Sequence, residues 1–533
     1  MANKYWAAGV SGNWNDILSW SDFAIGTPAG AVVPGAGDAA IFNAASGTVT
    51  ATLDISPDIQ TLTMTGFTGT LAFGTNTISL NSTGTIFTGS TTTTVTGTPL
   101  IICTDSSATA RTITPTTVTE ANSISFRITA GTGGLTFTSG AVVRNLDFTD
   151  GTNPTGYAGA LSNNAITIYG NFLASTGMSA TGSNAFTFAA TSGTKTITFN
   201  GLTIDRAFTF NGVGGTWQLQ DALTSGSARA CTLTNGTLDL NGYTATFGSV
   251  SSSNSNARTF AFGSTGKIVV TGTNATVYNT SVATGLTITG TRTVEFTGVG
   301  TGGQTRTITG GVTTTGGTAA TAVDCYIQAG ADAIDFGTAN RTYRTINFTG
   351  FGSGTIAANT RPNIYGDFVL SATMTVTGGT NNWIFAATTA QTITTNSVTI
   401  NNPITFNGVG GTWAMQDALT MPSQPLTMTN GTLRLKSGTT STVGSFVTSG
   451  TNVKFLQATT PGTQATISDA SGTNSVSYLT IQDSYATGGA AWDANASTNV
   501  NAGNNFGWFF APTPADSNEI TMRLRSFTQP RRF

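Results

Sequence analysis

The chain has 533 residues, of which 8% are charged, and its formal net charge is −2. Ordinary soluble domains carry roughly 25% charged residues, and this balance leaves no global basic footprint for nucleic acid. The absence of histidine excludes Ser-His-Asp and Cys-His catalytic arrangements and removes the commonest transition-metal ligand.

The composition indicates an almost entirely β protein. The chain has 66 Gly, 31 Phe and only three Glu, and it is rich in Thr. Branched and aromatic side chains pack well on a pleated sheet, whereas strong helix formers are scarce here. The three cysteines, Cys103, Cys231 and Cys325, are too far apart for a zinc motif, so we expect buried thiols.

Residues 1–50 differ from the rest of the chain. They hold three of the eight tryptophans, Trp6, Trp14 and Trp20. Repeat arrays need a cover over their open core, so we expect an N-terminal cap or attachment module here. The stretch has no apolar segment like that of a signal peptide, and no run in the chain approaches the ~18 apolar residues of a membrane span. We therefore expect no signal-peptide export and no membrane anchor.

A long segment of the sequence occurs twice. FTFNGVGGTWQLQDALT at 208–224 returns as ITFNGVGGTWAMQDALT at 404–420, an offset of 196 residues. Shorter matches keep the same order, with small insertions between them: RTIT at 111–114 and 306–309, and RNLDFT at 144–149 and RTINFT at 344–349. The duplication predicts a first β repeat over 51–265 and a second over 266–460, followed by a C-terminal β module over 461–511 and a tail over 512–533.

Within each repeat, apolar and polar residues alternate in short runs such as Ala207–Phe210 and Thr216–Leu219. Alternation of period two places the apolar side chains of a strand on one face. Asn-Gly pairs at 200–201, 211–212 and 235–236 separate the runs. Both residues tolerate left-handed backbone, so these pairs predict turns.

We therefore predict an all-β fold, a parallel β-solenoid-like repeat array with capping modules at both ends. Recurring Thr and Asn favour the solenoid, because their side chains can bond to one another along the stack. The alternative is a string of tandem β-sandwich domains of about 100 residues each. The long period of the duplication fits both architectures.

Two acidic residues are the candidates for chemistry. Asp221 and Asp417 follow the repeated tryptophan by four residues, which is compatible with a glycan-cleaving carboxylate. Aspartate at a strand end also caps turns, and we expect that role. The repeated tryptophans alternate with core residues, so we expect packing rather than sugar stacking. The predicted repeat core contains Trp217, Trp413, Phe210 and Phe406. We expect no catalytic residue, no cofactor and no metal site, since the calcium-binding nonapeptide GGxGxDxUx is absent.

The tail over 512–533 closes on MRLRSFTQPRRF, in which basic and aromatic residues interleave. Arginine is suited to docking against phosphate or acidic protein surfaces. We expect this tail to dock on a neighbouring subunit of an assembly through Arg523, Arg525, Phe527, Arg531, Arg532 and Phe533.

Three segments resemble structural proteins of tailed-bacteriophage virions, of the Gly/Thr-rich repeat type. They are the opening YWAAGVSGNWND with VPGAGDAAIF, the repeat motif FNGVGGTWxxQDALT, and the segment SYLTIQDSYATGGAAWDANASTNVNAGNNFGWFF near the C-terminus. The resemblance covers both ends and both repeat copies. It implies a virion location and a tail-fibre-like or surface-appendage role, and it supplies no catalytic residues.

The expected function is that of a non-enzymatic virion protein, a fibre, spike or capsid-surface appendage for assembly and host attachment. The expected partners are other virion proteins and a host cell-surface glycan or protein, without nucleic acid or membrane. We expect a homo-oligomer such as a trimer, made in the host cytoplasm without a signal peptide. Two alternatives stay open. One is a bacterial cell-surface adhesin, and the other is a polysaccharide-cleaving tailspike with carboxylates converging in a groove.

Overall fold

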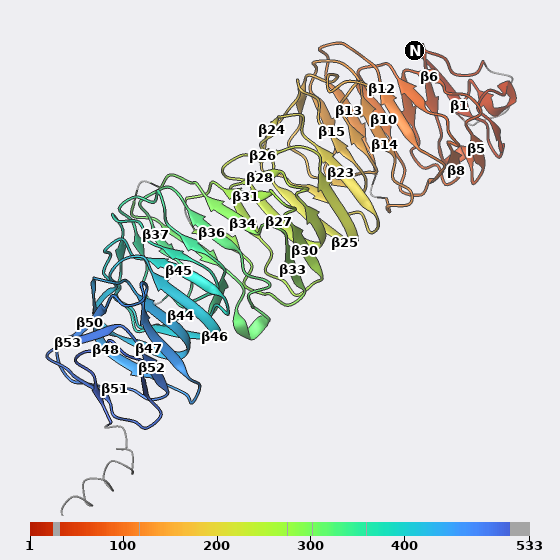
Figure 1. Ribbon diagram of the computed structural model, residues 1–533. Helices are drawn as coiled ribbons and strands as arrows, with labels where there is room; N and C mark the ends of the chain where they lie inside the picture. Colours follow the sequence, from red (N-terminus) through yellow and green to blue (C-terminus); the bar gives the residue numbers. More distant parts are fainter. Residues whose placement is uncertain (25–31, 117, 274, 301, 359, 512–533) are drawn as a thin grey trace, which may run out of the picture. The chain divides into compact units, whose positions relative to one another are not determined.

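Helix makes up about 2% of the described residues, and the strands form parallel β-solenoid turns, about 21 in all (Figure 1). The predicted solenoid is therefore confirmed over the sandwich alternative. No helix among the described residues is long and apolar enough to span a bilayer. The 3-10 helices are η1 (Ile17–Ser19), η2 (Ala44–Ser46) and η3 (Thr313–Thr315). The computed structural model describes residues 1–24, 32–116, 118–273, 275–300, 302–358 and 360–511.

Contacts between residues divide the chain into two units. The first consists of Met1–Gly300 with Arg306–Val323, and the second of Thr301–Thr305 with Asp324–Phe533. The expected boundary between the two sequence repeats, at 265/266, lies inside the first unit. Each turn stacks on its neighbours whichever repeat it belongs to, so sequence repeats and contact units need not coincide.

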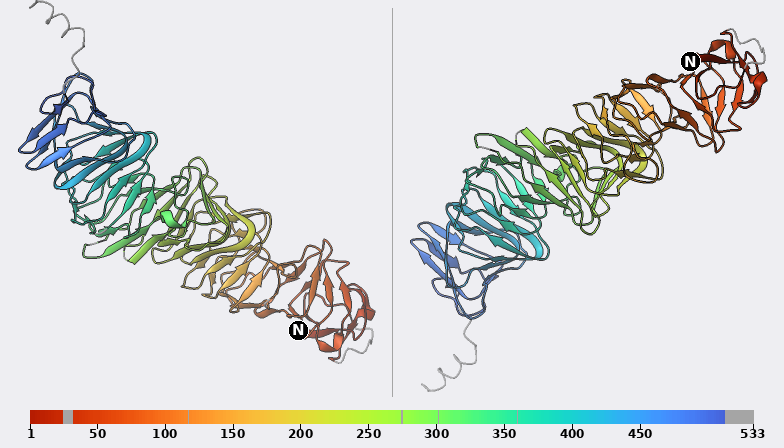
Figure 2. Two further views of the ribbon diagram at one scale, coloured as in Figure 1. Left: turned by 90° about the horizontal axis from the view of Figure 1, so that it is seen from below. Right: turned by 90° about the horizontal axis from the view of Figure 1, so that it is seen from above.

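In the first unit, successive turns contribute strands to three faces (Figures 1 and 2). Most strands pair in parallel with the strand one turn earlier on the same face. Ile113, for example, lies between Phe87 and Phe137, which are 26 and 24 residues away in sequence. At this spacing, each turn of the chain returns the alternating apolar side chains to the same interior column.

The first face contains β1 (Ala2–Trp6), β3 (Trp20–Ser21), β4 (Asp38–Ile41), β7 (Thr61–Thr63), β10 (Gly84–Thr88), β13 (Arg111–Thr114), β15 (Leu135–Phe137), β18 (Ala160–Leu161), β21 (Ser179–Ala180), β24 (Thr203–Ile204), β26 (Leu223–Ser225), β28 (Thr244–Phe247), β31 (Lys267–Val270) and β34 (Thr293–Phe296). The second face contains β2 (Gly12–Asn13), β5 (Thr50–Thr52), β8 (Thr70–Ala72), β11 (Thr94–Thr96), β16 (Ala141–Val143), β19 (Ile166–Ile168), β22 (Phe186–Phe188), β29 (Ser249–Ser251), β32 (Ala275–Asn279) and β35 (Thr305–Thr309). The third face contains β6 (Asp58–Ile59), β9 (Ile78–Leu80), β12 (Leu100–Cys103), β14 (Ser125–Ile128), β17 (Leu146–Asp147), β20 (Phe172–Leu173), β23 (Thr194–Thr198), β30 (Arg258–Ala261) and β33 (Leu286–Thr289). The long strands β25 (Phe208–Leu219) and β27 (Ala230–Asp239) belong to both the second and the third face.

The second unit is built in the same way. One ladder contains β36 (Asp324–Ile327), β39 (Ile346–Asn347), β42 (Phe368–Val369), β45 (Ala390–Thr394), β46 (Ile404–Met415), β47 (Thr420–Leu435), β49 (Lys454–Ala458), β52 (Leu479–Ile481) and β55 (Val500–Asn501). The remaining strands are β37 (Ala333–Asp335), β38 (Arg341–Tyr343), β40 (Thr355–Ile356), β41 (Pro362–Ile364), β43 (Thr375–Val376), β44 (Trp383–Phe385), β48 (Thr440–Thr448), β50 (Ala465–Asp469), β51 (Thr473–Ser475), β53 (Ser484–Gly488), β54 (Ala491–Ala494) and β56 (Phe509–Phe510).

The repeated FNGVGGTW segment forms one continuous strand in each copy, β25 and β46. Each pairs first with a strand of one face and then with a strand of the next, so it turns a corner of the solenoid. The turns predicted at Asn211-Gly212 and Asn235-Gly236 are therefore wrong, because the first pair lies inside β25 and the second inside β27. Glycine is needed at this corner, since a Cβ on Gly212 would lie 1.9 Å from the carbonyl oxygen of Ala190. Asn200 and Gly201, in contrast, have the left-handed φ values of 52° and 76° of the predicted turn.

Inward-facing rings stack from turn to turn in the core. The ring centroids of Phe188 and Phe210 lie 5.2 Å apart with their planes at 13°, and Trp217 lies 5.7 Å from Phe210. In the second copy, Phe406 and Trp413 are 5.0 Å apart. The four residues expected in the repeat core are at most 1% exposed. Burial of each such ring contributes on the order of 2 kcal/mol.

Polar side chains also bond along the stack, as the recurring Thr and Asn predicted. Nδ2 of Asn235 donates to Oδ1 of Asn211 at 2.7 Å in the first copy. In the second copy, Asn452 donates to Asn430 at 2.6 Å, and Asn430 donates to Asn407 at 2.7 Å. These amide ladders satisfy the hydrogen-bonding groups of the asparagine side chains at the corners, and no charged partner is needed.

The N-terminal end of the first face is closed by an antiparallel strand. β1 pairs in parallel with β4 on one side and antiparallel with β3 on the other. Trp6, Trp14 and Trp20 are fully buried and pack edge to face, with ring centroids 4.8–5.1 Å apart for the two pairs that share Trp20. Phe42 joins this cluster at 5.3 Å from Trp6. The tryptophans therefore cover the end of the core.

Buried cations bonded to backbone carbonyls are a feature that sequence reasoning missed. Arg111, Arg206 and Arg258 are at most 2% exposed. Arg206 donates to the carbonyl oxygens of Asn184 at 2.7 Å, of Ser162 at 2.9 Å and of Asn164. For Arg111 the available signal was the motif RTIT, which recurs at 306–309, but arginine is usually a surface residue, so burial was not expected.

All three thiols are buried, as predicted, and they give a direct test of the fold. Burial raises the pKa of Cys103 to about 12 and also raises the pKa values of Cys231 and Cys325. We expect no alkylation of the native protein at pH 8.5, and complete alkylation in guanidinium chloride, because the thiolate is the reactive form. Since the folded state retains protons that the unfolded thiols lose above pH 9, stability should fall above that pH. Rapid native labelling would contradict the packing.

Candidate functional site

One hollow of the first unit is a groove on the third face, formed by two adjoining cavities of about 500 Å³ and about 430 Å³. Arg144, Asn145 and Asn171 line both cavities, so the two lie side by side. Hydroxyl, amide and charged side chains line the groove together with the apolar residues Pro99, Leu100, Phe126, Leu146 and Leu173; the polar ones include Thr75, Thr77, Thr98, Ser125, Arg127, Asp147, Glu120, Tyr169, Thr194 and Lys195. We call this surface the third-face groove.

Stacked turns place the floor of the third-face groove. The strand pairings put Thr77, Leu100, Ser125, Asn145, Asn171 and Thr196 at one register position of six consecutive turns. Adjacent parallel strands lie about 4.8 Å apart, so five steps give a length of about 24 Å. The groove can therefore hold an extended chain rather than only a small compact ligand.

Side-chain hydrogen bonds hold this floor. Nδ2 of Asn145 donates to Oγ of Ser125 at 3.1 Å, and Oδ1 of Asn145 accepts from the backbone N–H of Asn171 at 2.7 Å. Oδ1 of Asn171 accepts from the N–H of Thr196 at 2.8 Å. The amides are thus fixed in orientation before any ligand arrives.

Glu120 and Ala121, which lie between β13 and β14, form one wall of the groove. The described residues of their turn form no strand on the second face, and Glu120 reaches along the side of the solenoid to Thr191, where Oε2 accepts from Oγ1 at 2.6 Å and from N–H at 3.3 Å. Arg144 fastens the same segment, because its Nη2 donates to the carbonyl oxygen of Ala121 at 2.8 Å. The wall is therefore tied at two points.

Three cations and two carboxylates line the groove. Arg127 pairs with Asp147 at 2.8 Å, and Asp147 also accepts two bonds from Thr149. Neither Arg144 nor Lys195 forms an ion pair with a described residue. These two half-buried cations are therefore available to an anionic ligand. The residues of this groove are spread over six turns, so no local sequence pattern indicates it.

Asp221 and Asp417 do not lie in this groove, and both cap turns of the preceding coil. Oδ1 of Asp221 accepts from the N–H of Phe199 at 2.8 Å. Asp417 accepts from the N–H of Thr395 at 2.9 Å and from the N–H of Ser397 at 3.3 Å. The geometry matches the expected turn-capping role.

Removing the Asp417 carboxylate should cost more than removing that of Asp221. Ser397 has a φ of 63°, whereas Gly201 occupies the equivalent turn position of the first copy. Left-handed backbone is unfavourable for serine, so its turn depends more on the cap. We expect Asp417→Ala to lower the free energy of unfolding by about 2 kcal/mol and Asp221→Ala by about 1 kcal/mol, measured by guanidinium unfolding. Ser397→Gly should rescue most of the Asp417→Ala loss. Equal losses without rescue would contradict this role.

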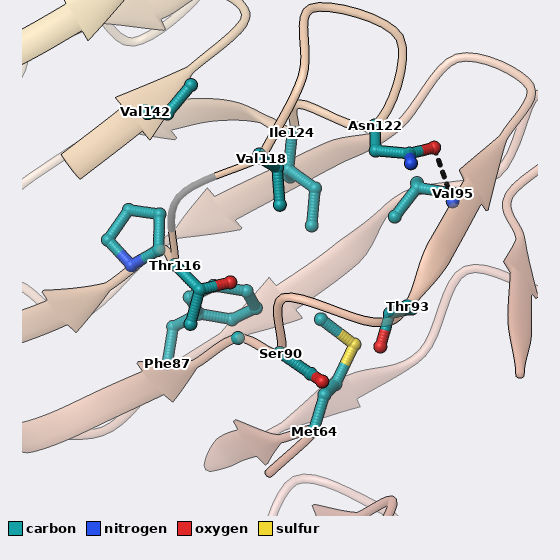
Figure 3. Close-up of a pocket in the computed structure, with 12 residues that line it drawn as sticks. Met64, Phe87, Ser90, Thr93, Val95, Thr116, Val118, Asn122, Ile124 and Val142 are labelled. Atoms are coloured by element: carbon teal, nitrogen blue, oxygen red, sulfur yellow. Dashed lines mark hydrogen bonds between the residues drawn. The ribbon is translucent and has the colours of Figure 1, made fainter. Parts of the chain in front are cut away.

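A second hollow of the first unit is small and mostly apolar (Figure 3). Met64, Phe87, Val95, Ile124 and Val142 surround about 20 Å³, which is room for about one water molecule. It lies in the same turn as Glu120, whose described residues form no strand on the second face. It is too small for an organic ligand.

Several predicted sites lie elsewhere or outside the described residues. The docking residues expected in the tail, Arg523, Arg525, Phe527, Arg531, Arg532 and Phe533, fall in 512–533, outside the described part of the chain. Within the described ranges, no group of three or more Cys, Asp or Glu side chains is arranged to hold a metal ion. No family model, no curated protein and no solved structure matches this chain.

Proposed function

We propose that this chain is a non-enzymatic structural protein of a bacteriophage particle, a fibre, spike or capsid-surface appendage for assembly and host attachment. The observation that carries the proposal is the third-face groove on a self-stacking β-solenoid. Stacked turns give a fixed scaffold, and an open polar groove gives a contact surface. The fold is compatible with fibre and spike proteins. The resemblance of both ends and both repeats to virion proteins supports the location.

The proposed partners are other virion proteins and a host cell-surface glycan or protein, without nucleic acid or membrane. The chain would work as a homo-oligomer such as a trimer, and it would be made in the host cytoplasm and carried on the particle. Docking through the arginines and phenylalanines of the 512–533 tail stays a prediction.

A polysaccharide-cleaving tailspike is the competing function for such a groove, since it contains Glu120 and Asp147. Glycoside hydrolysis needs one protonated and one free carboxyl group flanking the bond. Here Glu120 accepts two hydrogen bonds from Thr191, and Asp147 is paired with Arg127. This engagement favours binding over cleavage. Release of reducing ends from a polysaccharide by wild type but not by Glu120→Gln would establish the tailspike instead.

Competition for adsorption tests the attachment role. Purified chain should block adsorption of the particle to host cells in a saturable way, because it would occupy the same surface receptors. Heat-unfolded chain is the matched control and should not compete. Undiminished adsorption at saturating folded chain would overturn attachment by this protein.

A further inference from the structure

We propose that the third-face groove of the first repeat binds an acidic polysaccharide, with Arg144 and Lys195 contacting its carboxylates and the Asn and Thr floor contacting its hydroxyls. The inference rests on the proposed attachment function, since it names the class of ligand. The proposed binding site lies in the first repeat only, and the second repeat lacks it.

The second repeat supplies an internal comparison for this groove. β14, β17, β20 and β23 carry the groove, and β36, β39, β42 and β45 are their counterparts, with the same pairings along the ladder. Asn171 and its counterpart Asp367 even keep one hydrogen bond, each accepting a backbone N–H from the next turn at 2.8 and 2.7 Å. The two sites therefore share a backbone and differ in side chains.

The charges differ between the copies. Arg127, Arg144 and Lys195 of the first groove correspond to Tyr326, Arg344 and Gln391. Ser125, Asp147 and Asn171 correspond to Asp324, Asn347 and Asp367. The first copy thus has three cations and one carboxylate at these positions, and the second has one cation and two carboxylates. Only the first is suited to an anion.

The equivalent arginines show the same difference in their contacts. Arg344 is held by Asp324 through two hydrogen bonds, one of them 2.7 Å from Nε to Oδ1. Arg144 has Ser125 in place of that aspartate, and its described bonds go to backbone carbonyls. A guanidinium bonded to neutral acceptors retains its full charge for an incoming carboxylate. The backbone carbonyls therefore fix the position of the Arg144 guanidinium, and no described carboxylate neutralises its charge.

The length and polarity of the groove favour a polysaccharide over other anions. Six turns span about 24 Å, which suits an extended polymer. Apart from Leu100, the floor presents hydroxyls and amides, which pair with sugar hydroxyls in both donor and acceptor roles. The cations exceed the carboxylates of the groove by only one when Glu120 is included, which is little for a nucleic acid, whose affinity comes mainly from phosphate neutralisation.

Moving one cation between the copies tests the proposal without changing the net charge. The double variant Lys195→Gln with Gln391→Lys transfers the cation from the first site to the second. Each position then carries the residue that the other copy has at the equivalent position. Affinity of the full chain for polygalacturonate, alginate and hyaluronate would be measured by calorimetry in calcium-free buffer. We expect wild type to bind at least one of these polymers and the double variant to bind it about tenfold more weakly.

Ser125→Asp supplies the aspartate of the second copy and should weaken binding to a similar extent by pairing with Arg144. Arg434→Gln, a cation of the second unit outside the groove, is the matched control and should bind as wild type. Protection of the three thiols from alkylation verifies that each variant is folded.

Equal binding by wild type and the double variant would overturn the proposal. So would equal binding of methyl-esterified polygalacturonate, tighter binding of single-stranded DNA, or no binding of any of the three polymers. Any of these results together with saturable competition for adsorption would leave the attachment function standing and remove only the assignment of an acidic polysaccharide to the groove.

Discussion

Replacing Trp217 with alanine is expected to lower the free energy of unfolding of the first unit by about 4 kcal/mol. The indole is fully buried and contacts Phe210 and Phe188, with ring centroids 5.7 and 6.3 Å away. The next strand carries Cys231, which pairs with Phe208 in the ladder. Opening of these turns should therefore expose the thiol, and its alkylation rate should rise by about a thousandfold.

Two variants control this experiment. Trp413→Ala removes the equivalent ring of the second copy and should destabilise the second unit similarly while leaving Cys231 protected. Trp217→Phe should cost only about 1 kcal/mol, because the indole N–H has no described hydrogen-bond partner to lose. Unchanged protection of Cys231 in Trp217→Ala would show that this ring does not hold the corner of the solenoid.

Replacing Arg206 with methionine is expected to lower the free energy of unfolding by about 3 kcal/mol, despite similar side-chain volume. The guanidinium satisfies carbonyl oxygens of Ser162, Asn164 and Asn184 and lies 4.8 Å from the ring centroid of Phe186. Burial, and then the charge of Arg229, lower its pKa to about 10, so the cation is held at a desolvation cost that these carbonyls offset. Guanidinium unfolding followed by circular dichroism measures the loss.

The control for Arg206 is Arg434→Met. Arg434 is exposed and donates only to Oε1 of Gln457 at 3.2 Å, so its loss should change stability by less than about 0.5 kcal/mol. The stability of Arg206→Lys should lie between that of wild type and that of Arg206→Met, because an ammonium reaches fewer carbonyls than a guanidinium fork. Equal stability of Arg206→Met and wild type would mean that water satisfies the three carbonyls instead.

Local pattern and duplication together predicted the solenoid. Alternation over Thr216–Leu219 gave the correct inward face, and recurring Asn and Thr gave the correct ladders. The corner at 211–212 was predicted wrongly, since Asn-Gly is also used where a continuing strand passes close to the previous turn. Turn chemistry alone cannot distinguish a chain that reverses from one that bends around a corner.

The groove could not be predicted in the same way. Its floor brings together residues from Thr77 to Thr196, and their register depends on how many residues each intervening loop contains. The cation Lys195 was visible as a departure from Gln391 in the second copy, and Ser125 as a departure from Asp324. The sequence differences between the two repeats were thus the available signal for the groove. The sequence matches between the repeats indicate only the core that they share.

Gold-labelled antibodies against this chain, applied to intact particles released by lysis and viewed by electron microscopy, test the proposed function most directly. We predict several labels per particle at fixed positions on the tail or the capsid surface. We also predict that the same antibodies block adsorption of the particle to host cells. Labels restricted to the bacterial envelope, with none on washed particles, would contradict a virion appendage and favour a cell-surface adhesin.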